Sequence, residues 1–155
     1  MSKGFLKGPS SKGNGMLKGV DPVLSGGLLK ALDEMGHGDT LALVDRNYPS
    51  YSAGPPVVHL GDISAVRAAQ AIFTVFPLDT FIETPLVRMR ADEGPEATET
   101  HNLVWQEATR NHPQALPEAL IPRPDFYERA GHCAVIVQCL ETAPYSCFIL
   151  RKGVV

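Results

Sequence analysis

Residues 34–52, EMGHGDTLALVDRNYPSYS, contain the pattern on which the fold class depends. The apolar residues of TLALV are consecutive rather than alternating, which is typical of a strand that is buried on both faces. A histidine, His37, lies between two glycines ahead of this strand, and Asp45 directly follows it. Because a helix-like run precedes the histidine, we expect a helix, a tight turn and a buried strand in succession, as in α/β domains.

The helix ahead of this strand is predicted from its cap and its apolar spacing. Ser25 is a suitable N-cap, and Leu28, Leu32 and Met35 follow at helical intervals on one face. Gly36 is expected to adopt the left-handed conformation at which a helix stops.

Apolar spacing predicts three further helices. Asp62 is expected to cap the second, whose apolar stripe consists of Val66, Ala69, Phe73 and Phe76. A weaker helical pattern covers residues 98–111. A proline-rich, irregular connection at residues 112–125 then leads into a short helix at DFYERA, residues 125–130.

The remaining apolar runs predict the other strands. PVVHL, residues 56–60, is a short strand candidate, and PLVRMRA, residues 85–91, alternates as a strand with one wetter face does. The runs at residues 132–140 and 147–153 are close enough in sequence to form an antiparallel pair. We therefore predict a single α/β domain with a mixed β-sheet, a final hairpin and helices on both faces.

Composition limits the class of protein. At 155 residues, 44% of them apolar and 20% charged, the chain is typical of one soluble globular domain. The net charge of -3 and the absence of a basic stripe argue against nucleic acid as a partner. No run approaches the roughly 18 apolar residues of a membrane-spanning helix, so no membrane partner is expected.

The cysteines and the first residues bear on the location and the extent of the domain. Cys133, Cys139 and Cys147 are odd in number and form no CxxC pair, which favours reduced thiols and a cytoplasmic protein. Residues 1–15 are rich in Gly, Ser and Lys, and they lack the apolar segment of a secretory signal. We expect a disordered leader, or a remnant added ahead of the natural start, followed by the domain at residues 16–155.

Two polar residues flank the buried strand and are candidates for chemistry. His37, between Gly36 and Gly38, is unshielded by neighbouring side chains, and Asp45 lies at a strand end, where α/β sheets bind ligands. The strand between them spans roughly 20 Å or more. The two side chains should therefore not meet unless the loop folds back or a second subunit intervenes. The alternative is a histidine that caps a helix and an aspartate in a turn.

Three further residues are candidates for ligand binding. Arg123 and Tyr127 are four residues apart and would share a face of a helix, although a loop arginine is usually just solvated. Tyr145, ahead of the last strand, could stack on a ligand or donate a hydrogen bond, or it could be a core residue at a strand edge.

No cofactor site is evident. The possible metal ligands show neither HExxH spacing nor a cysteine pair, and they are His37, Asp39, Asp45, His59, Asp62 and His132. The sequence also contains no GxGxxG after a strand, no GxxxxGK[ST] and no GxSxG. We therefore expect neither a metal nor another cofactor.

Four stretches, taken together, resemble the RbsD/FucU family of bacterial sugar mutarotases. They are LLKALDEMGHGD at residues 28–39, LVDRNYP at 43–49, RPDFYERA at 123–130 and APYSCFILRKGV at 143–154. The resemblance extends over about 140 residues, from residue 16 nearly to residue 155. The motifs EMGHGD, FYERA and RKGV favour the fucose branch over the ribose branch.

The resemblance implies an isomerase that interconverts the α and β anomers of a free monosaccharide, L-fucose or a related sugar, without a cofactor. It also implies a ring-shaped homo-oligomer, often a decamer, whose sites are lined by neighbouring subunits. His37 and Asp45 would then meet the same sugar from different chains, or within one chain after the loop folds back.

The family's functional residues map onto positions of this chain. The proton donor falls on His37, and the substrate contacts fall on Asp45, Arg123 and the triplet Tyr145, Ser146 and Cys147. Two positions depart from the family pattern. Cys147 stands where an asparagine is usual, and Asn47 stands where fucose-type members tend to carry a histidine. A thiol donates and accepts hydrogen bonds only weakly in comparison with an amide, so these departures bear on the choice of sugar.

Two other functions are compatible with the sequence. A non-catalytic monosaccharide-binding protein, associated with transport or regulation, would use Asp45 and Arg123 without an essential role for His37. A metal-dependent isomerase would use His37 and nearby carboxylates, and its activity would be lost in a chelator.

Overall fold

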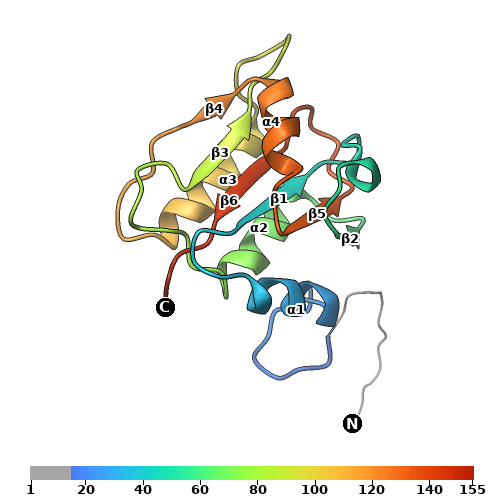
Figure 1. The fold of residues 1–155 in the computed structure, drawn as a ribbon, viewed down its shortest axis with the longest axis vertical. Helices are drawn as coiled ribbons and strands as arrows, with labels where there is room; N and C mark the ends of the chain where they lie inside the picture. Colours follow the sequence, from blue (N-terminus) through green and yellow to red (C-terminus); the bar gives the residue numbers. More distant parts are fainter. Residues whose placement is uncertain (1–14) are drawn as a thin grey trace.

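The computed structural model describes residues 15–155, which form one domain around a six-stranded sheet (Figure 1). The predicted leader therefore lies, except for Gly15, outside the described residues. The strands are β1 (Thr40–Val44), β2 (Val57–Gly61), β3 (Leu86–Met89), β4 (Leu120–Ile121), β5 (Val135–Cys139) and β6 (Phe148–Arg151). The helices are α1 (Gly26–Glu34), α2 (Ala65–Phe73), α3 (Glu99–Arg110) and α4 (Arg123–Ala130), with a 3-10 turn at Ser50–Ser52.

The sheet is mixed, as predicted, with the strand order β2-β5-β1-β6-β3-β4. β1 pairs in parallel with β5 on one side and antiparallel with β6 on the other. The predicted hairpin of β5 and β6 is therefore wrong, because β1 lies between them. The connection at residues 140–147 is long enough to step across one intervening strand, a distance of about 10 Å.

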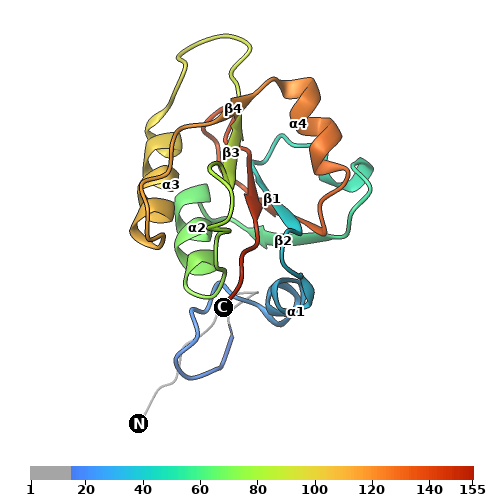
Figure 2. The same ribbon diagram turned by 60° about the vertical axis from the view of Figure 1, so that its left-hand side comes forward.

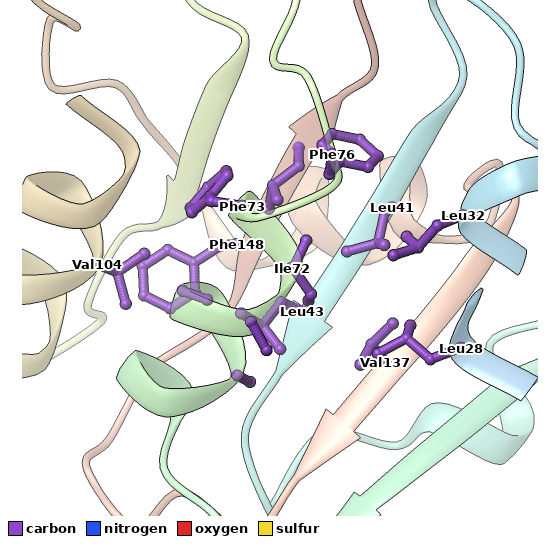
Figure 3. Close-up of a cluster of buried hydrophobic side chains, with 14 of the residues drawn as sticks. Leu28, Leu32, Leu41, Leu43, Ile72, Phe73, Phe76, Val104, Val137 and Phe148 are labelled. Atoms are coloured by element: carbon purple, nitrogen blue, oxygen red, sulfur yellow. The ribbon is translucent and has the colours of Figure 1, made fainter. Parts of the chain in front are cut away.

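Helices cover both faces of this sheet, as predicted (Figure 2). Leu41 and Leu43 of β1 pack under α1, α2 and α3, in the cluster of Figure 3. Ala42 and Val44 point to the other face, where they pack with Phe126 of α4. The alternation explains why the TLALV segment is apolar at consecutive positions, because both of its faces are buried.

The start of α1 follows its sequence signal, but its end does not. The Ser25 hydroxyl accepts a hydrogen bond from the Leu28 backbone N–H at 3.2 Å, which confirms the predicted N-cap. The expectation of a left-handed Gly36 is wrong, because α1 ends in an extended Met35. The left-handed residue is Gly38, with φ at 90°, where an added Cβ would lie 3.1 Å from Arg151 Nη2.

Two further expectations are corrected. α2 is capped by Ser64, whose hydroxyl accepts from the Arg67 N–H, rather than by Asp62. β3 has no wet face, because all four of its residues are buried, Arg88 completely. Arg88 lies on the side that α3 covers, and its guanidinium donates to Glu118 at 3.0 Å instead of reaching water.

The later helices lie where their patterns predicted them. α3 fills residues 99–110, with Thr98 as its N-cap and Asn111 as its C-cap. With 12 residues it is the longest helix within residues 15–155, and a bilayer requires about 20. None of the helices in this part of the chain is long and apolar enough to cross a membrane.

Candidate functional site: two cavities at opposite ends of β1

His37 lies in the turn between α1 and β1, half-exposed, and its ring is held by two contacts. Its Nε2 is 3.2 Å from Oδ1 of Asp79. The edge of the ring packs against Phe81, with the ring centroids 5.1 Å apart. An Nε2–H that donates to Asp79 leaves Nδ1 as the nitrogen with a free lone pair. The turn therefore presents an oriented imidazole to solvent.

Asp79 is a buried carboxylate that no sequence pattern indicates. Its side chain is 2% exposed and accepts from Arg151 Nε at 2.8 Å and from the Phe81 backbone N–H at 3.0 Å. Burial acts to raise the pKa of Asp79, but the bonds from Phe81, Arg151 and His37 outweigh it and lower that pKa. Asp79 therefore stays ionised beside His37 and fixes the orientation of its ring.

The cavity beside His37 has a volume of about 570 Å³. Its walls come from α1 and the C-terminal segment, and the lining residues include Leu29, Leu32, Met35, His37, Val75, Lys152 and Val154. The cavity lies at the end of the molecule where β1 begins and β6 ends. It combines His37, Asp33 and Lys152 with walls that are otherwise largely apolar.

Asp45 lies at the opposite end of β1, in a second cavity of about 280 Å³. This volume is near the lower end of the 300–1,000 Å³ typical of small-ligand sites. The second cavity is lined by Asp45, Asn47, Tyr48, Met89, Arg123, Tyr127, Pro144, Tyr145 and Cys147. Five of the predicted site residues are thus brought together from β1, α4 and the start of β6.

Backbone donors hold the Asp45 carboxylate. Oδ1 accepts from the Asn47 N–H and Oδ2 from the Ser146 N–H, each at 3.1 Å. Burial raises the pKa of Asp45, and the negative charge of nearby Glu141 raises it further. The two backbone bonds and the Cys147 thiol lower this pKa but do not outweigh burial. The carboxylate is therefore an oriented hydrogen-bond acceptor in the wall of this cavity.

Arg123 and Tyr127 share a face of α4, as their spacing predicted. The guanidinium carbon of Arg123 lies 5.8 Å from the centroid of the Tyr127 ring. Arg123 Nε also donates to Asp92 at 2.7 Å, and both of those side chains are nearly half exposed. The Tyr127 ring packs edge-on against Tyr48 at 5.2 Å. A cation and a phenol therefore lie at the mouth of the Asp45 cavity.

Of the three residues ahead of β6, two line the Asp45 cavity and the third, Ser146, has a buried side chain. Tyr145 and Cys147 line the Asp45 cavity. Ser146 does not, because its hydroxyl is buried without a hydrogen-bond partner and only its backbone N–H reaches Asp45. Burial raises the pKa of the Cys147 thiol far above its ordinary value, so Cys147 contributes a neutral group.

His37 and Asp45 do not meet within one chain, as their separation along β1 predicted. The two cavities share no lining residue. Because β6 runs antiparallel to β1, its first residues adjoin Asp45 and its last residues adjoin His37. Within residues 15–155, no three His, Cys, Asp or Glu side chains are grouped to hold a metal ion.

The fold and these cavities define a class of protein: a single α/β domain with a cavity beside a histidine at one end of a strand and a cavity around an aspartate at the other. The chain belongs to the RbsD / FucU transport protein family, whose model matches residues 18–155.

Individual relatives agree with this assignment. The L-fucose mutarotase of Histophilus somni is 38% identical over 143 residues, covering 90% of this chain and 97% of that protein. The fucose mutarotase of Streptococcus pneumoniae, solved in complex with L-fucose, is 32% identical with a TM-score of 0.84, covering 90% of this chain and 99% of that one. RbsD of Bacillus subtilis, solved with D-ribose, is 17% identical with a TM-score of 0.71 over 90% and 99% of the chains, and at that identity it shares the fold alone. The predicted similarity to the fucose branch is confirmed.

Proposed function

We propose that this protein is a cofactor-independent mutarotase that interconverts the α and β anomers of a free monosaccharide, L-fucose or a close relative. The observation that carries the proposal is the oriented imidazole of His37, bonded to buried Asp79 and open to a cavity. The second cavity supplies groups that bind hydroxyls. The family and its L-fucose mutarotase members support this choice of substrate.

His37 carries the proton transfer in this proposal. Mutarotation removes the proton of the anomeric hydroxyl and protonates the ring oxygen, and then the open chain recloses on the other face. An imidazole can give and take protons near neutral pH. A positioned acid or base contributes roughly 10²–10⁴-fold. Asp79 holds the ring and offsets the charge of the imidazolium.

The Asp45 cavity holds the sugar. The Asp45 carboxylate and the Arg123 guanidinium bind hydroxyls through charge-assisted hydrogen bonds. Tyr145 and Tyr127 supply phenols and apolar faces. The backbone around Ser146 orients Asp45, and the Cys147 thiol replaces an amide at the wall.

A complete site requires two subunits, because each chain carries its two halves at opposite ends of β1. We therefore propose a closed homo-oligomeric ring, a decamer, in which the His37 cavity of one subunit faces the Asp45 cavity of the next. Exposed apolar side chains support such an interface, because Val75, Phe81 and Val154 lie at the His37 cavity or on its histidine. The three buried free cysteines agree with a cytoplasmic protein.

Exchange NMR on the anomeric protons tests the proposal. L-fucose, D-ribose, D-galactose and D-glucose are each measured with and without protein. Selective acceleration of one sugar, abolished by His37→Asn in a protein that stays assembled, is the expected result. An active His37→Asn variant would rule out the assignment of the proton donor.

The second candidate is a non-catalytic monosaccharide-binding protein. Cys147 favours it, because the buried thiol lacks the hydrogen-bonding capacity of the usual asparagine. A binder shifts anomer populations at high protein concentration without accelerating their exchange. The same NMR series therefore separates the two candidates.

A further inference from the structure

We infer that His101 is a positioning residue for the sugar-binding half-site: its ring fixes the peptide that joins Tyr145 to Ser146, and through that peptide both the Tyr145 side chain and the Asp45 carboxylate. This inference rests on the proposed sugar site. His101 lies on α3, is 1% exposed and lines neither cavity.

The backbone at Tyr145 requires an external restraint. Among residues 15–155, Tyr145 is the one non-glycine residue with a positive φ, at 58°. Tyrosine rarely adopts this conformation, and such residues persist only where the surroundings hold them. Tyr145 nevertheless contributes its side chain to the Asp45 cavity.

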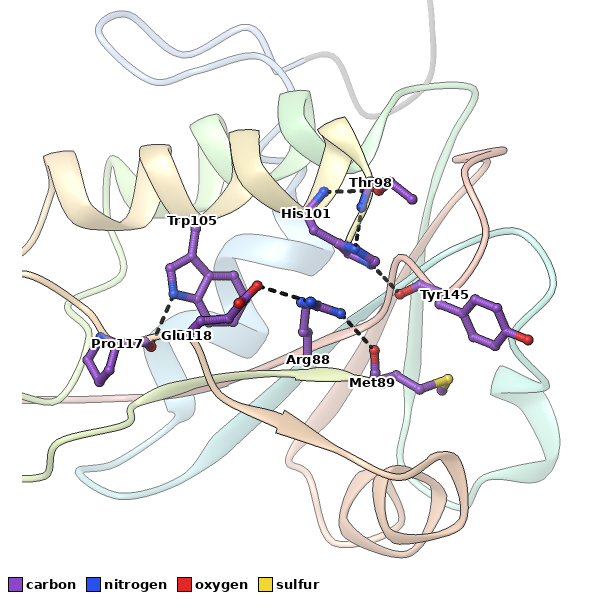
Figure 4. A network of polar contacts seen from close by, with 8 residues as sticks. All are labelled: Arg88, Met89, Thr98, His101, Trp105, Pro117, Glu118 and Tyr145. Carbon is purple, nitrogen blue, oxygen red and sulfur yellow. Dashed lines mark hydrogen bonds and ion pairs between the residues drawn. The ribbon is translucent and has the colours of Figure 1, made fainter. Parts of the chain in front are cut away.

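His101 supplies that restraint through one nitrogen. Its Nε2 lies 2.8 Å from the backbone oxygen of Tyr145, whose phenol points away from the histidine (Figure 4). The Thr98 backbone N–H donates to His101 Nδ1 at 3.0 Å. Because Nδ1 accepts there, the ring proton must be on Nε2, which can then donate to Tyr145. Burial lowers the pKa of His101. The bond to the Tyr145 oxygen opposes this effect and the positive charge of Arg88 adds to it, and the net lowering favours the neutral ring.

The same peptide unit is held from its other side by Asp45. Its oxygen, that of Tyr145, accepts from His101, while its N–H, that of Ser146, donates to Asp45 Oδ2 at 3.1 Å. Rotation of this peptide would break both bonds. The two bonds also polarise each other, as hydrogen bonds in a chain do. His101 therefore sets the position of two sugar-binding groups that it does not touch.

A matched pair of variants isolates the donor to Tyr145. Glutamine and glutamate both suit the third position of a helix capping box, so His101→Gln and His101→Glu can each accept from the Thr98 N–H. Only the glutamine amide can also donate to the Tyr145 oxygen. The affinity for L-fucose, or for whichever sugar of the panel the wild type binds, is measured by calorimetry, and anomer exchange is measured on the same samples.

His101→Gln is expected to bind sugar nearly as the wild type does, whereas His101→Glu should weaken binding about 10- to 100-fold, as misplaced binding groups do. The loss should appear in KM rather than kcat, because proton transfer stays with His37. Equal affinities of the two variants would overturn the inference. Wild-type protein that binds sugar without accelerating exchange would instead refute the proposed catalysis, while the affinities still decide the role of His101.

The tautomer offers a test that needs no variant. In protein labelled with ¹⁵N at histidine, His101 should show a protonated Nε2 and an unprotonated Nδ1. A proton on Nδ1 would exclude the bond to Tyr145 and overturn the inference, even if His101→Glu does not fold.

Discussion

At the scale of single residues, Asp79 contributes both to the stability of the turn that carries His37 and to the proposed proton transfer by that histidine. One buried carboxylate accepts from the histidine, from Arg151 and from the Phe81 backbone. The residue therefore both orients the imidazole and ties it to the end of β6. Its loss should affect catalysis and folding in separable ways.

We predict that Asp79→Asn lowers kcat for anomer exchange by roughly 10- to 100-fold, part of the 10²–10⁴-fold that a positioned acid–base group contributes. An amide can still contact His37 but cannot offset the imidazolium charge. KM should change little, because the sugar-binding groups lie in the other cavity. Saturation kinetics by exchange NMR would measure both constants, and an unchanged kcat would show that Asp79 has no part in proton transfer.

The lowered pKa of Asp79 also predicts how stability changes in acid. A carboxylate with a depressed pKa stabilises the fold fully above the ordinary carboxyl pKa of about 3.9, and this contribution is lost as pH falls through the folded-state pKa. The difference in free energy of unfolding between the wild type and Asp79→Asn should therefore shrink below about pH 4. Urea denaturation from neutral pH to about pH 3 would measure it.

Asp45→Asn should show the opposite trend, because the pKa of Asp45 is raised. The free energy of unfolding of the wild type should increase relative to that of Asp45→Asn as pH falls through this raised pKa.

The sequence indicated the candidate residues that line the two cavities better than the residues that hold them in place. The flanking glycines indicate His37, and the end of a strand indicates Asp45. Helical spacing indicates Arg123, and the start of the last strand indicates Tyr145. Asp79 and His101 left no such signal. They are 42 and 44 residues from the groups that they hold, and only the folded sheet brings them close.

At the scale of elements, local patterns predicted some features and missed others. Ser25 caps α1 and TLALV is buried on both faces, as predicted, but Ser64 rather than Asp62 caps α2. The pairing of β5 and β6 was predicted wrongly because nearness in sequence does not fix neighbours in a sheet. Insertion of β1 between them depends on contacts that no short segment contains.

The backbone at Gly153, which follows β6, is packed so closely against the Asp79 segment that an added methyl group should force the two apart. A Cβ at Gly153 would lie 2.8 Å from the Leu78 oxygen and from Asp79 Cα, both backbone atoms. We predict that Gly153→Ala destabilises the protein by about 1–3 kcal/mol, as overpacking does, and lowers kcat by displacing Asp79. Gly27→Ala is the matched control, because nothing lies within 4 Å of its added Cβ. Thermal unfolding would compare them, and equal melting temperatures would contradict the prediction.

At the scale of the whole molecule, the main consequence of the fold is that β1 places His37 and Asp45 in two separate cavities. The sequence predicted this separation from the strand rise alone, and the structure confirms it with two cavities that share no residue. The number of subunits could not be obtained in this way, because it depends on the angle between neighbours rather than on any one chain.

Complementation between two inactive variants provides the corresponding prediction. His37→Asn and Asp45→Asn subunits, each inactive alone, are unfolded together and refolded as a 1:1 mixture. Suppose that each site takes His37 from one subunit and Asp45 from the next. Half of the sites then receive an intact His37 and half receive an intact Asp45, so roughly a quarter of the sites receive both. Exchange NMR should then recover about one quarter of the wild-type activity, while light scattering shows the same assembly. A mixture as inactive as its components would place both residues of each site in one chain, which would require the turn at His37 to refold towards the carboxyl end of β1.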